Sequence, residues 1–512
     1  MVVSASAVVL AAQAGWFVAT TSGTYDETTY LAYGRAVYES LDAKALAEWG
    51  VAPLPVLLTS AAPAIAGWPS YPRAITLARI SAIVLFGVPL VAVTYWTLLH
   101  AIGPDAAIGG TVLVSLSPNI VAHTALATTD VCFLVAALAA LAVLAHNLET
   151  SSRRSRVLLG ASLAVALSAK YSAIALFGIV ALAWCTRRRN SSTPFLSRAV
   201  VALALTAGLF GAALVFVWIL HALALVPFGL PPIETVRLPA PLVGIARQLH
   251  HQSVGEPSFL LGRRSRVGTW YYMPVALAMK STPAELLIAA VAMTRLRDGW
   301  RHPSPSGFVW RLAIVMFGIG AVVNRIAFGV RYMLITMPLA TFLAAEWWCG
   351  ISNRRRRLLA AGGLVALQLW SAWSIGPHYL SYFNAWAGGP ERGYTRLADS
   401  NVDWGQDLPT LKVQLTRLGA KHPLMSYFGT APPEAYGLHA DPWDSRVQEK
   451  FERWDWVAIS ATNVDGVFLP SDPFADFRML TPGSRAGYSI LLYPTSREDV
   501  RRAMTTAAIR MQ

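Results

Sequence analysis

The stretch at residues 153–189 reads RRSRVLLGASLAVALSAKYSAIALFGIVALAWCTRRR, an apolar run with arginines at both ends. A membrane span takes about 20 apolar residues, so the run at 157–186 is too long for one span and too short for two full ones. Arginines mark the cytoplasmic side, and both ends carry them. Two short helices that meet at Ser168-Ala169-Lys170-Tyr171 satisfy both constraints, with Lys170 near the outer end of the hairpin. One long helix with its basic ends on opposite faces is the alternative.

The whole chain has the composition of a membrane protein. Of its 512 residues, 55% are hydrophobic and 14% are charged, and the mean hydropathy is +0.46. Soluble globular chains carry about 25% charged residues. The formal net charge is +14, but most lysines and arginines stand in short loops between apolar runs, which is typical of membrane orientation. We therefore expect membrane lipids as partners and no nucleic acid.

The cysteines give no sign of disulfides or metal sites. Cys132, Cys185 and Cys349 fall in or beside apolar segments and are interpreted as small hydrophobic core residues. The sequence contains no CxxC or HExxH pattern, so we predict neither a bound metal nor a cofactor.

The apolar runs and the basic loops together predict the topology. Residues 2–20 lack the basic segment of a signal peptide and are interpreted as a first span. Four basic loops are placed in the cytoplasm: Arg153, Arg154 and Arg156; Arg187, Arg188, Arg189 and Arg198; Arg295, Arg297, Arg301 and Arg311; and Arg354 to Arg357. This arrangement gives about eleven spans, with the N-terminus inside and the C-terminus outside. The main outer loops are then 21–78 and the basic loop 227–268, which would draw anionic headgroups to the surface.

The composition changes near residue 391 to that of a soluble domain. Residues 407–419 have the leucine spacing of an amphipathic helix. Residues 424–428, 456–460 and 488–493 have the pattern of short strands. We predict an α-helical polytopic membrane domain over 1–390, followed by an outer mixed α/β domain over 391–512.

Three charged positions stand at the outer ends of spans. Asp26 and Glu27 follow the first span, either as an exposed acidic pair or as a general base held at the membrane surface. Asp130 stands beside an apolar run, where a carboxylate is costly and is therefore a candidate functional group. Capping of a helix that begins at Val131 is its plain alternative role. Lys170 could reach water from the hairpin tip or bind a phosphate.

Several motifs appear in order along the chain. They are Asp26-Glu27 after the first span, Ser117-Pro-Asn-Ile-Val-Ala-His123 leading to Thr128-Thr129-Asp130, Ser168-Ala-Lys-Tyr171, Trp270-Tyr271-Tyr272-Met-Pro-Val-Ala276 with Lys280, and Gly329-Val-Arg331-Tyr332. Together they resemble the GT-C glycosyltransferases, in particular bacterial relatives of the protein O-mannosyltransferases and of the lipid A aminoarabinose transferase. The segment 399–407, with Asp403, Trp404, Gln406 and Asp407, resembles uncharacterised bacterial members of that group. The resemblance covers about residues 25–410.

The resemblance implies a reaction. Such enzymes take a sugar from a polyprenyl monophosphate and pass it to an acceptor, with inversion at the anomeric carbon. It maps the general base to Asp26, with Glu27 and Asp130 as further catalytic acids. It maps donor phosphate binding to Lys170, Arg331 and Tyr332, because fixed cations stabilise a leaving phosphate. Further substrate contacts would come from Tyr271, Tyr272 and Lys280, and from the segment 399–407 if that segment is not purely structural.

One position departs from the family pattern. Relatives often carry an arginine five residues before the second acid, and Ala125 stands there in this chain. Donor phosphate binding must therefore rest on other cations. The acceptor, whether protein, lipid or cell-envelope polymer, is not specified by the sequence.

We interpret the chain as a sugar transferase that acts on the outer face of a bacterial plasma membrane. Two other classes of function are alternatives to this interpretation. A lipid or sugar transporter or flippase often has paired halves with interrupted helices at corresponding positions, and the sequence shows no such symmetry. A membrane scaffold that presents the tail domain would leave Asp26, Asp130 and Lys170 without a reason to face one compartment.

Overall fold

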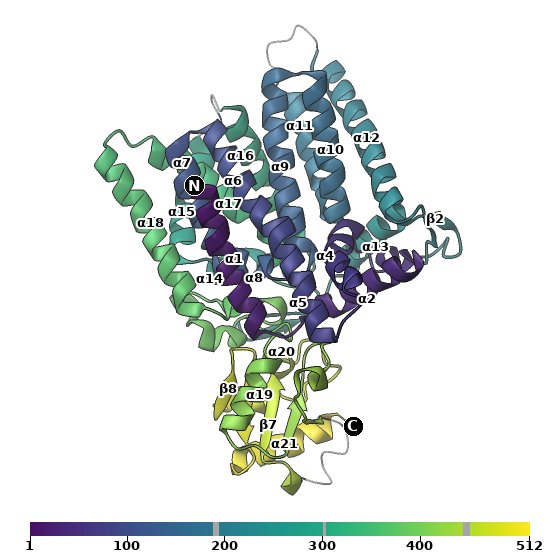
Figure 1. Cartoon of the computed structure of the whole chain (residues 1–512), viewed down its shortest axis with the longest axis vertical. Coiled ribbons are helices and arrows are strands. Elements are labelled where there is room, and N and C mark those ends of the chain that lie inside the picture. Colours follow the sequence, from purple (N-terminus) through teal and green to yellow (C-terminus); the bar gives the residue numbers. More distant parts are fainter. Residues whose placement is uncertain (188–193, 299, 301–303, 444–450, 512) are drawn as a thin grey trace.

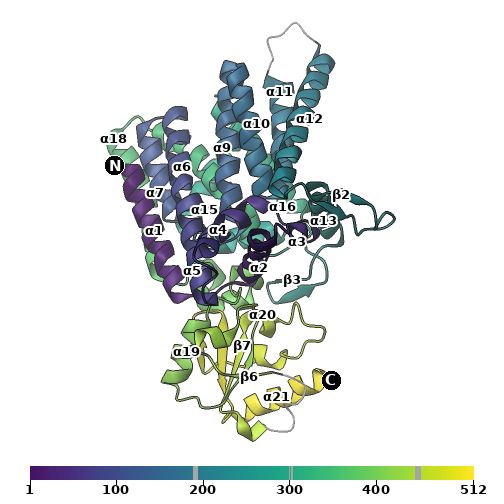
Figure 2. The same ribbon diagram turned by 45° about the vertical axis from the view of Figure 1, so that its right-hand side comes forward.

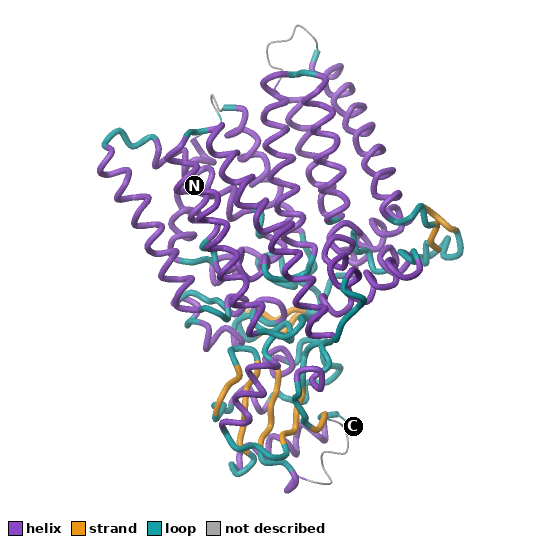
Figure 3. Tube along the Cα trace, viewed as in Figure 1, coloured by secondary structure: helices purple, strands orange, loops and turns teal. Residues whose placement is uncertain are grey.

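The structure is a computed structural model that describes residues 1–187, 194–298, 300, 304–443 and 451–511. Long helices form one end of the molecule, and a smaller domain with most of the strands forms the other (Figures 1 and 3). Arg188, Arg189 and Arg301 of the predicted basic loops lie outside the described residues.

The first part of the chain is helical, interrupted by two short hairpins of strands. The hairpins pair β1 (Leu225–Pro227) with β2 (Arg237–Pro239) and β3 (Ser258–Leu260) with β4 (Arg263–Ser265). The helices are α1 (Val2–Thr20), α2 (Tyr25–Ser40), α3 (Lys44–Glu48), α4 (Pro53–Ile65), α5 (Tyr71–Ala82), α6 (Val88–Ala101), α7 (Pro104–Ser115), α8 (Pro118–Thr124), α9 (Thr129–Thr150), α10 (Arg153–Ala169), α11 (Ile174–Arg187), α12 (Phe195–Leu220), α13 (Ala240–Val254), α14 (Tyr272–Lys280), α15 (Pro283–Asp298), α16 (Pro305–Val323), α17 (Thr336–Cys349) and α18 (Arg354–Ile375).

Among the described residues, 6 helices are long and apolar enough to cross a membrane. They are α1, the continuous helix Tyr71–Ala101, α9, α12, α16 and α18, and the pair α7–α8, bent by 67°, would raise the number to 7. The chain is therefore a multi-pass membrane protein, but the predicted count of about eleven spans is not confirmed. Several helices assigned as spans, such as α11 and α17, have only 14 residues each, short of the usual length of a span.

The predicted hairpin at residues 157–186 is present. α10 ends at Ala169, a single turn η2 (Tyr171–Ala173) follows, and α11 begins at Ile174. Lys170 lies between the two helices in an extended backbone conformation, with φ −162° and ψ 133°. The first residues of α10 and the last of α11 lie at the end of the molecule opposite the C-terminal domain (Figures 1 and 2). The alternative of one long helix is therefore wrong.

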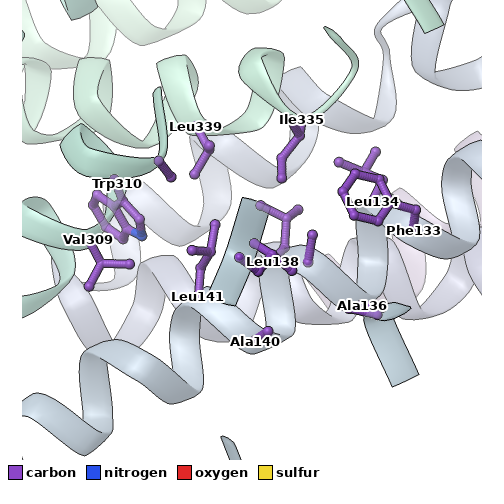
Figure 4. Packing of buried hydrophobic residues seen from close by; sticks show 14 of the residues in the cluster. Phe133, Leu134, Ala136, Leu138, Ala140, Leu141, Val309, Trp310, Ile335 and Leu339 are labelled. Atoms are coloured by element: carbon purple, nitrogen blue, oxygen red, sulfur yellow. The ribbon is translucent and has the colours of Figure 1, made fainter. Parts of the chain in front are cut away.

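The membrane helices pack through a core of apolar side chains. Leu138 and Leu141 of α9 lie on the side of Trp310 of α16 and Leu339 of α17, and Leu134 lies farther along α9 beside Phe133 (Figure 4). In lipid, close packing replaces the hydrophobic effect as the force that joins helices, and alanines on α9 let neighbouring backbones approach. The packed α9 holds Asp130 in a fixed position in its first turn.

The C-terminal domain is a mixed sheet with helices, as predicted. The strand order is β6-β5-β7-β9-β8, in which β5 is parallel to β6 and β7, and β9 is antiparallel to β7 and β8. Its predicted helix and strands are confirmed as α19, β5, β7 and β9, whereas the domain boundary at residue 390 stays a prediction. The elements are β5 (Pro423–Ser426), β6 (Asp441–Pro442), β7 (Trp456–Ser460), β8 (Ser484–Ala486), β9 (Ile490–Pro494), α19 (Leu408–Arg417), α20 (Ala461–Asp465) and α21 (Glu498–Arg510).

Candidate active site

Four charged side chains from separate parts of the chain meet near the N-terminal end of α9. Arg331 Nη1 donates to Asp26 Oδ2 at 2.8 Å and lies 3.8 Å from Asp130 Oδ2. Lys170 Nζ donates to Asp130 Oδ1 at 2.6 Å. The sequence analysis assigned all four residues to the reacting centre, and the fold brings them together as two acids and two cations. We call these four residues the charged cluster.

The access of the four groups to solvent differs. The side chain of Asp130 is 1% exposed and that of Arg331 is 8% exposed, whereas Asp26 and Lys170 are 23% and 19% exposed. Ion pairs with little water around them are strong, because the local dielectric is low. Asp26 and Lys170 therefore present the accessible groups, and the other two hold them in place.

Asp130 does not cap a helix that begins at Val131, so that alternative is wrong. The helix begins at Thr129 with Thr128 as its N-cap residue, which places Asp130 inside the first turn. The carboxylate accepts from Lys170 and also lies 3.4 Å from the hydroxyl of Thr128. Its role in the structure is to orient the cations of the charged cluster.

Arg331 is fixed by the loop that carries it. It lies in the turn η3 (Val330–Met333), directly after Gly329, whose φ is +122°. A Cβ atom on Gly329 would lie 2.8 Å from Ser400 Oγ and 2.9 Å from Asn401 Oδ1, so only glycine fits there. The backbone N–H of Val330 donates to Asn401 Oδ1 at 3.1 Å. Segment 399–407 therefore sets the position of the Arg331 loop.

Aromatic rings surround both cations. The Arg331 guanidinium lies 4.3 Å from the ring centre of Trp404, and Lys170 Nζ lies 4.4 Å from that of Tyr332. Cation–π contacts of this kind fix a cation without neutralising it. The Arg331 Nε atom is buried and has no hydrogen-bond partner among the described residues. The cluster thus keeps an unused donor beside its ion pairs.

Two cavities adjoin at the charged cluster. The first, of about 660 Å³, is lined by Asp26, Tyr30 and Tyr33 of α2 and by Gln248 and His251 of α13. The second, of about 570 Å³, is lined in part by apolar side chains of α9, α11 and α16, such as Phe133, Leu134, Ala175, Met316 and Phe317. Its lining also includes Asp130, Gln252 and Arg325. Lys170, Arg331 and Tyr332 line both cavities. We call the first, which is lined by Asp26, Tyr30 and Tyr33, the polar cavity, and the second, which is bordered by α9 and α16, the apolar cavity; both linings combine apolar and charged side chains.

Glu27 lies next to Asp26 in the sequence but has a different environment. Its carboxylate, 0% exposed, accepts from Arg79 Nε at 2.8 Å and from Arg79 Nη2 at 2.7 Å. It also accepts from the backbone N–H groups of Thr24 and Ala127. Burial opposes its ionisation, but the charge of Arg79 and these hydrogen bonds outweigh burial and lower the pKa of Glu27. Glu27 is not among the residues that line either cavity, and its contacts join α2 to α5 and to the loop before α9.

Lys280 and Tyr272 lie in the packed interior. Lys280 Nζ, buried, donates to the carbonyl oxygens of Leu380 and Asn401 at 2.7 and 2.6 Å. The Tyr272 hydroxyl accepts from Asn401 Nδ2 at 3.0 Å. Both residues thus hold segment 399–407, while Tyr271 is 39% exposed. None of the three lines the two cavities.

The acidic segment 399–407 is buried between the two domains. Asp403 accepts from the backbone N–H groups of Gly405 and Thr462, and burial raises its pKa to about 8. Asp407 accepts from Ser489 Oγ at 2.7 Å. Gln406 accepts from the N–H of Trp404 at 2.7 Å. Of the four residues that the sequence singled out here, only Trp404 contacts the charged cluster.

Several residues around the site had no signal in the sequence. Arg79 stands in an apolar helix, and nothing in its spacing from Glu27 indicated their pairing. Asn401 had no predicted contact with the Arg331 loop. Tyr30 and Tyr33 could have been found, because they follow Asp26 by four and seven positions and therefore share its helix face. Among the described residues, no group of three or more His, Cys, Asp or Glu side chains could hold a metal ion.

No protein-family model and no curated protein matches the sequence. The structure is similar to the oligosaccharyltransferase AglB from Archaeoglobus fulgidus, solved with an inhibitory peptide and a dolichol-phosphate, with a TM-score of 0.51 and 12% identity over 93% of this chain and 71% of that one. ArnT from Cupriavidus metallidurans bound to undecaprenyl phosphate matches with a TM-score of 0.48 and 14% identity over 97% of this chain and 98% of that one.

The similarity to the oligosaccharyltransferase, at 12% sequence identity, shows that the two proteins share a fold. The chain has the GT-C fold, a helical membrane domain followed by a C-terminal domain, as the motifs in the sequence predicted.

Proposed function

We propose that this chain is an inverting glycosyltransferase that moves a sugar from a polyprenyl-phosphate donor to an acceptor hydroxyl. The observation that carries the proposal is the shared wall of the two cavities. Lys170 and Arg331 stand where a space bordered by the membrane helices α9 and α16 adjoins a space that contains the accessible acid Asp26. A lipid-linked sugar donor needs an apolar space for its lipid, cations for its phosphate and a space beside a base for its sugar and the acceptor, in this order.

The apolar cavity suits the lipid end of the donor. Part of its lining comes from α9 and α16, which are long enough to span the membrane, and the apolar side chains there match an isoprenoid chain. The donor phosphate would then lie against Lys170 and Arg331, whose positive charges face both cavities. Positioned cations in a poorly hydrated site stabilise the charge that develops on a leaving phosphate.

Asp26 suits the role of general base. In the reaction the acceptor oxygen bonds to the anomeric carbon while the bond from that carbon to the phosphate oxygen breaks. The hydroxyl proton passes to the Asp26 carboxylate, and the electron pair of the broken bond leaves with the phosphate. Attack opposite the leaving group inverts the anomeric configuration. A base within hydrogen-bond reach contributes about 10²- to 10⁴-fold to such a step.

The Asp26–Arg331 ion pair gives the two substrates an order. Asp26 is occupied by Arg331 at 2.8 Å in this structure. A donor phosphate would compete for the same guanidinium and leave the carboxylate available to the acceptor. Donor binding therefore makes the Asp26 carboxylate available as a base, whereas in the free enzyme Asp26 stays paired with Arg331.

The other predicted site residues take supporting roles in this proposal. Glu27 fixes the start of α2 through Arg79, and Asp130 orients Lys170. Lys280, Tyr272, Asp403, Gln406 and Asp407 hold the segment that carries Trp404 and positions Arg331. Tyr332 lines the donor side, and Tyr271 stays a predicted substrate contact.

The site faces outward in a bacterial plasma membrane under this proposal. The basic ends of α10 and α18 lie opposite the C-terminal domain in Figure 1, and basic ends mark the cytoplasmic side. The charged cluster and the C-terminal domain would then both be extracytoplasmic. Lipid-linked sugars presented on the outer leaflet would reach the cluster from the membrane.

The test is release of lipid phosphate by the purified full-length chain. A panel of polyprenyl-phosphate sugars is offered with membrane extract as the acceptor source, and free polyprenyl phosphate is measured. We expect release with at least one donor, and its loss in Lys170→Met. Arg35→Met is the matched control, because Arg35 lies on α2 in an exposed ion pair with Glu39. Movement of intact lipid-linked sugar across the membrane without release would indicate a flippase and refute the proposal.

A further inference from the structure

We propose that the polar cavity binds a neutral saccharide as the acceptor and that the C-terminal domain supplies part of the binding surface. This inference rests on the proposed transfer reaction and names the chemical class of its acceptor. The two domains meet beside the start of α2, which Figure 2 shows in the lower part of the helical region. Thr430, from the loop after β5, lines the polar cavity together with Tyr25 of α2.

Four aromatic rings form a continuous strip at this junction. Tyr25 stacks on Phe428 with centroids 5.4 Å apart and planes at 21°, and Phe428 stacks on Phe468 at 5.6 Å and 11°. Phe468 meets Phe328 at 6.2 Å. We call these four residues the aromatic strip. Both of its ends, Tyr25 and Phe328, line the polar cavity. Phe428 and Phe468, from the C-terminal part of the chain, are not among the lining residues and join the two ends through ring contacts.

The strip is held in place by backbone contacts. The N–H of Tyr25 donates to the carbonyl of Trp404 at 2.9 Å, and the hydroxyl of Thr430 donates to the carbonyl of Tyr25 at 2.8 Å. Tyr25 is nevertheless 43% exposed, and Trp49, also in the lining, is 72% exposed. Rigid and accessible aromatic faces are the surface on which the C–H face of a sugar ring packs.

The same cavity offers hydroxyl groups that nothing else uses. Tyr30 and Tyr33 lie on the face of α2 that carries Asp26, and within the described residues neither hydroxyl makes a hydrogen bond. Burial and the nearby Asp26 raise the pKa of Tyr30 well above its ordinary value, so its hydroxyl stays protonated. Protonated phenols next to the general base suit the ring of hydroxyls on a saccharide.

The charges of the polar cavity favour a neutral ligand. Its cationic lining residues are Lys170 and Arg331, which are paired with Asp130 and Asp26 and which the donor phosphate would engage. His251 is held by Glu256 at 2.5 Å. An acceptor rich in phosphate would find no other lining cation in the described part of the chain. A volume of about 660 Å³ is in the ordinary range for a small-molecule site, about 300–1,000 Å³.

A peptide acceptor fits the lining less well. Extended peptides gain affinity by pairing with an exposed strand edge. The described residues that line the polar cavity come from helices, turns and loops, and none belongs to a strand. Flat rings and free hydroxyls recognise a saccharide directly, whereas the backbone of a peptide would find no row of partners here.

Acceptor binding can be measured without a donor. The full-length chain in lipid nanodiscs is probed by saturation-transfer difference NMR with cellotetraose, maltotetraose and an uncharged Ser/Thr-containing octapeptide. We expect transfer to the ring C–H protons of at least one tetrasaccharide. Phe428→Leu and Phe468→Leu should each weaken that binding by about threefold to tenfold, because Tyr25 and Phe328 then lose the neighbouring ring that fixes them. Phe428→Tyr keeps the flat face and should bind as the wild type does.

Trp386→Ala is the matched control, because Trp386 is 93% exposed and lies outside the aromatic strip. It should leave tetrasaccharide binding unchanged. Binding of the octapeptide in a manner weakened by Phe428→Leu would overturn the saccharide class. Tetrasaccharide binding that ignores both leucine variants would overturn the role of the strip. Absence of any tetrasaccharide signal, while undecaprenyl phosphate still binds, would refute this inference and leave the proposed function standing; loss of lipid phosphate binding would count against the proposed function itself.

Discussion

Replacement of Glu27 by glutamine should destabilise the protein more than replacement of its neighbour Asp26 by asparagine. Glu27 and Arg79 form a two-pronged ion pair at 2.7 and 2.8 Å, and both side chains are at most 1% exposed. Removing one partner leaves a buried charge without compensation, which costs about 3–5 kcal/mol. Asp26 is 23% exposed and has one charged partner at hydrogen-bond distance. Asp26→Asn should therefore cost less than Glu27→Gln, because the Asp26 carboxylate reaches water and Asp130 still faces Arg331 at 3.8 Å.

The two variants should separate equally clearly in activity. Asp26→Asn removes the proton acceptor and should lower turnover by about 10²-fold or more. Donor affinity should not fall and should rise, because the phosphate then no longer competes with a carboxylate for Arg331. The fraction of Glu27→Gln that stays folded should retain turnover of the same order as the wild type. The assay combines denaturant unfolding in mixed micelles with release of lipid phosphate. Glu39→Gln on the same helix is the matched control, because its pair with Arg35 is exposed and contributes about 0.3–0.5 kcal/mol. A stable but inactive Glu27→Gln beside an active Asp26→Asn would show that the two roles are exchanged.

Three further variants test the surroundings of the site. Lys170→Met should lower both donor binding and turnover for every polyprenyl-phosphate sugar, and Lys170→Arg should restore only part; an effect confined to one sugar would make Lys170 a sugar contact. Gly329→Ala should lower turnover by at least about tenfold, because a methyl group would meet Ser400 and push the Arg331 loop aside; Gly362→Ala, at a position open on all sides, is its control. Burial raises the pKa of Asp399 to about 7, against about 3.9 in the unfolded chain. The unfolded state then binds fewer protons between these values, so stability should fall as pH rises from about 4 to 7, and the unfolding temperature of Asp399→Asn should fall less over that window.

The fold was largely predictable because membrane helices can be recognised in a sequence as long runs of apolar residues. The runs of apolar residues, the arginines at 153–156 and 187–189 and the break at Lys170 sufficed to place the hairpin. The number of spans was not predictable in the same way. Short helices such as α11 are buried among neighbours rather than in lipid, so their length does not follow the thickness of the bilayer.

The sequence indicated which four residues could form the charged cluster, but it did not indicate how they pair. Asp26, Asp130, Lys170 and Arg331 were each visible as charges at the edges of apolar runs, where an uncompensated charge is costly. Their pairing was not visible, because it depends on contacts between residues as far apart as Asp26 and Arg331. The difference between Asp26 and Glu27 could not be read from the sequence either, since it depends on Arg79, whose approach is set by the packing of α2 on α5.

The most direct measurement is an experimental structure of the full-length chain with undecaprenyl phosphate in nanodiscs. The account predicts the phosphate within hydrogen-bond distance of both Lys170 and Arg331, the isoprenoid chain in the apolar cavity, and Asp26 released from Arg331. A phosphate bound elsewhere, or an Asp26–Arg331 pair still intact at 2.8 Å beside a bound phosphate, would contradict it.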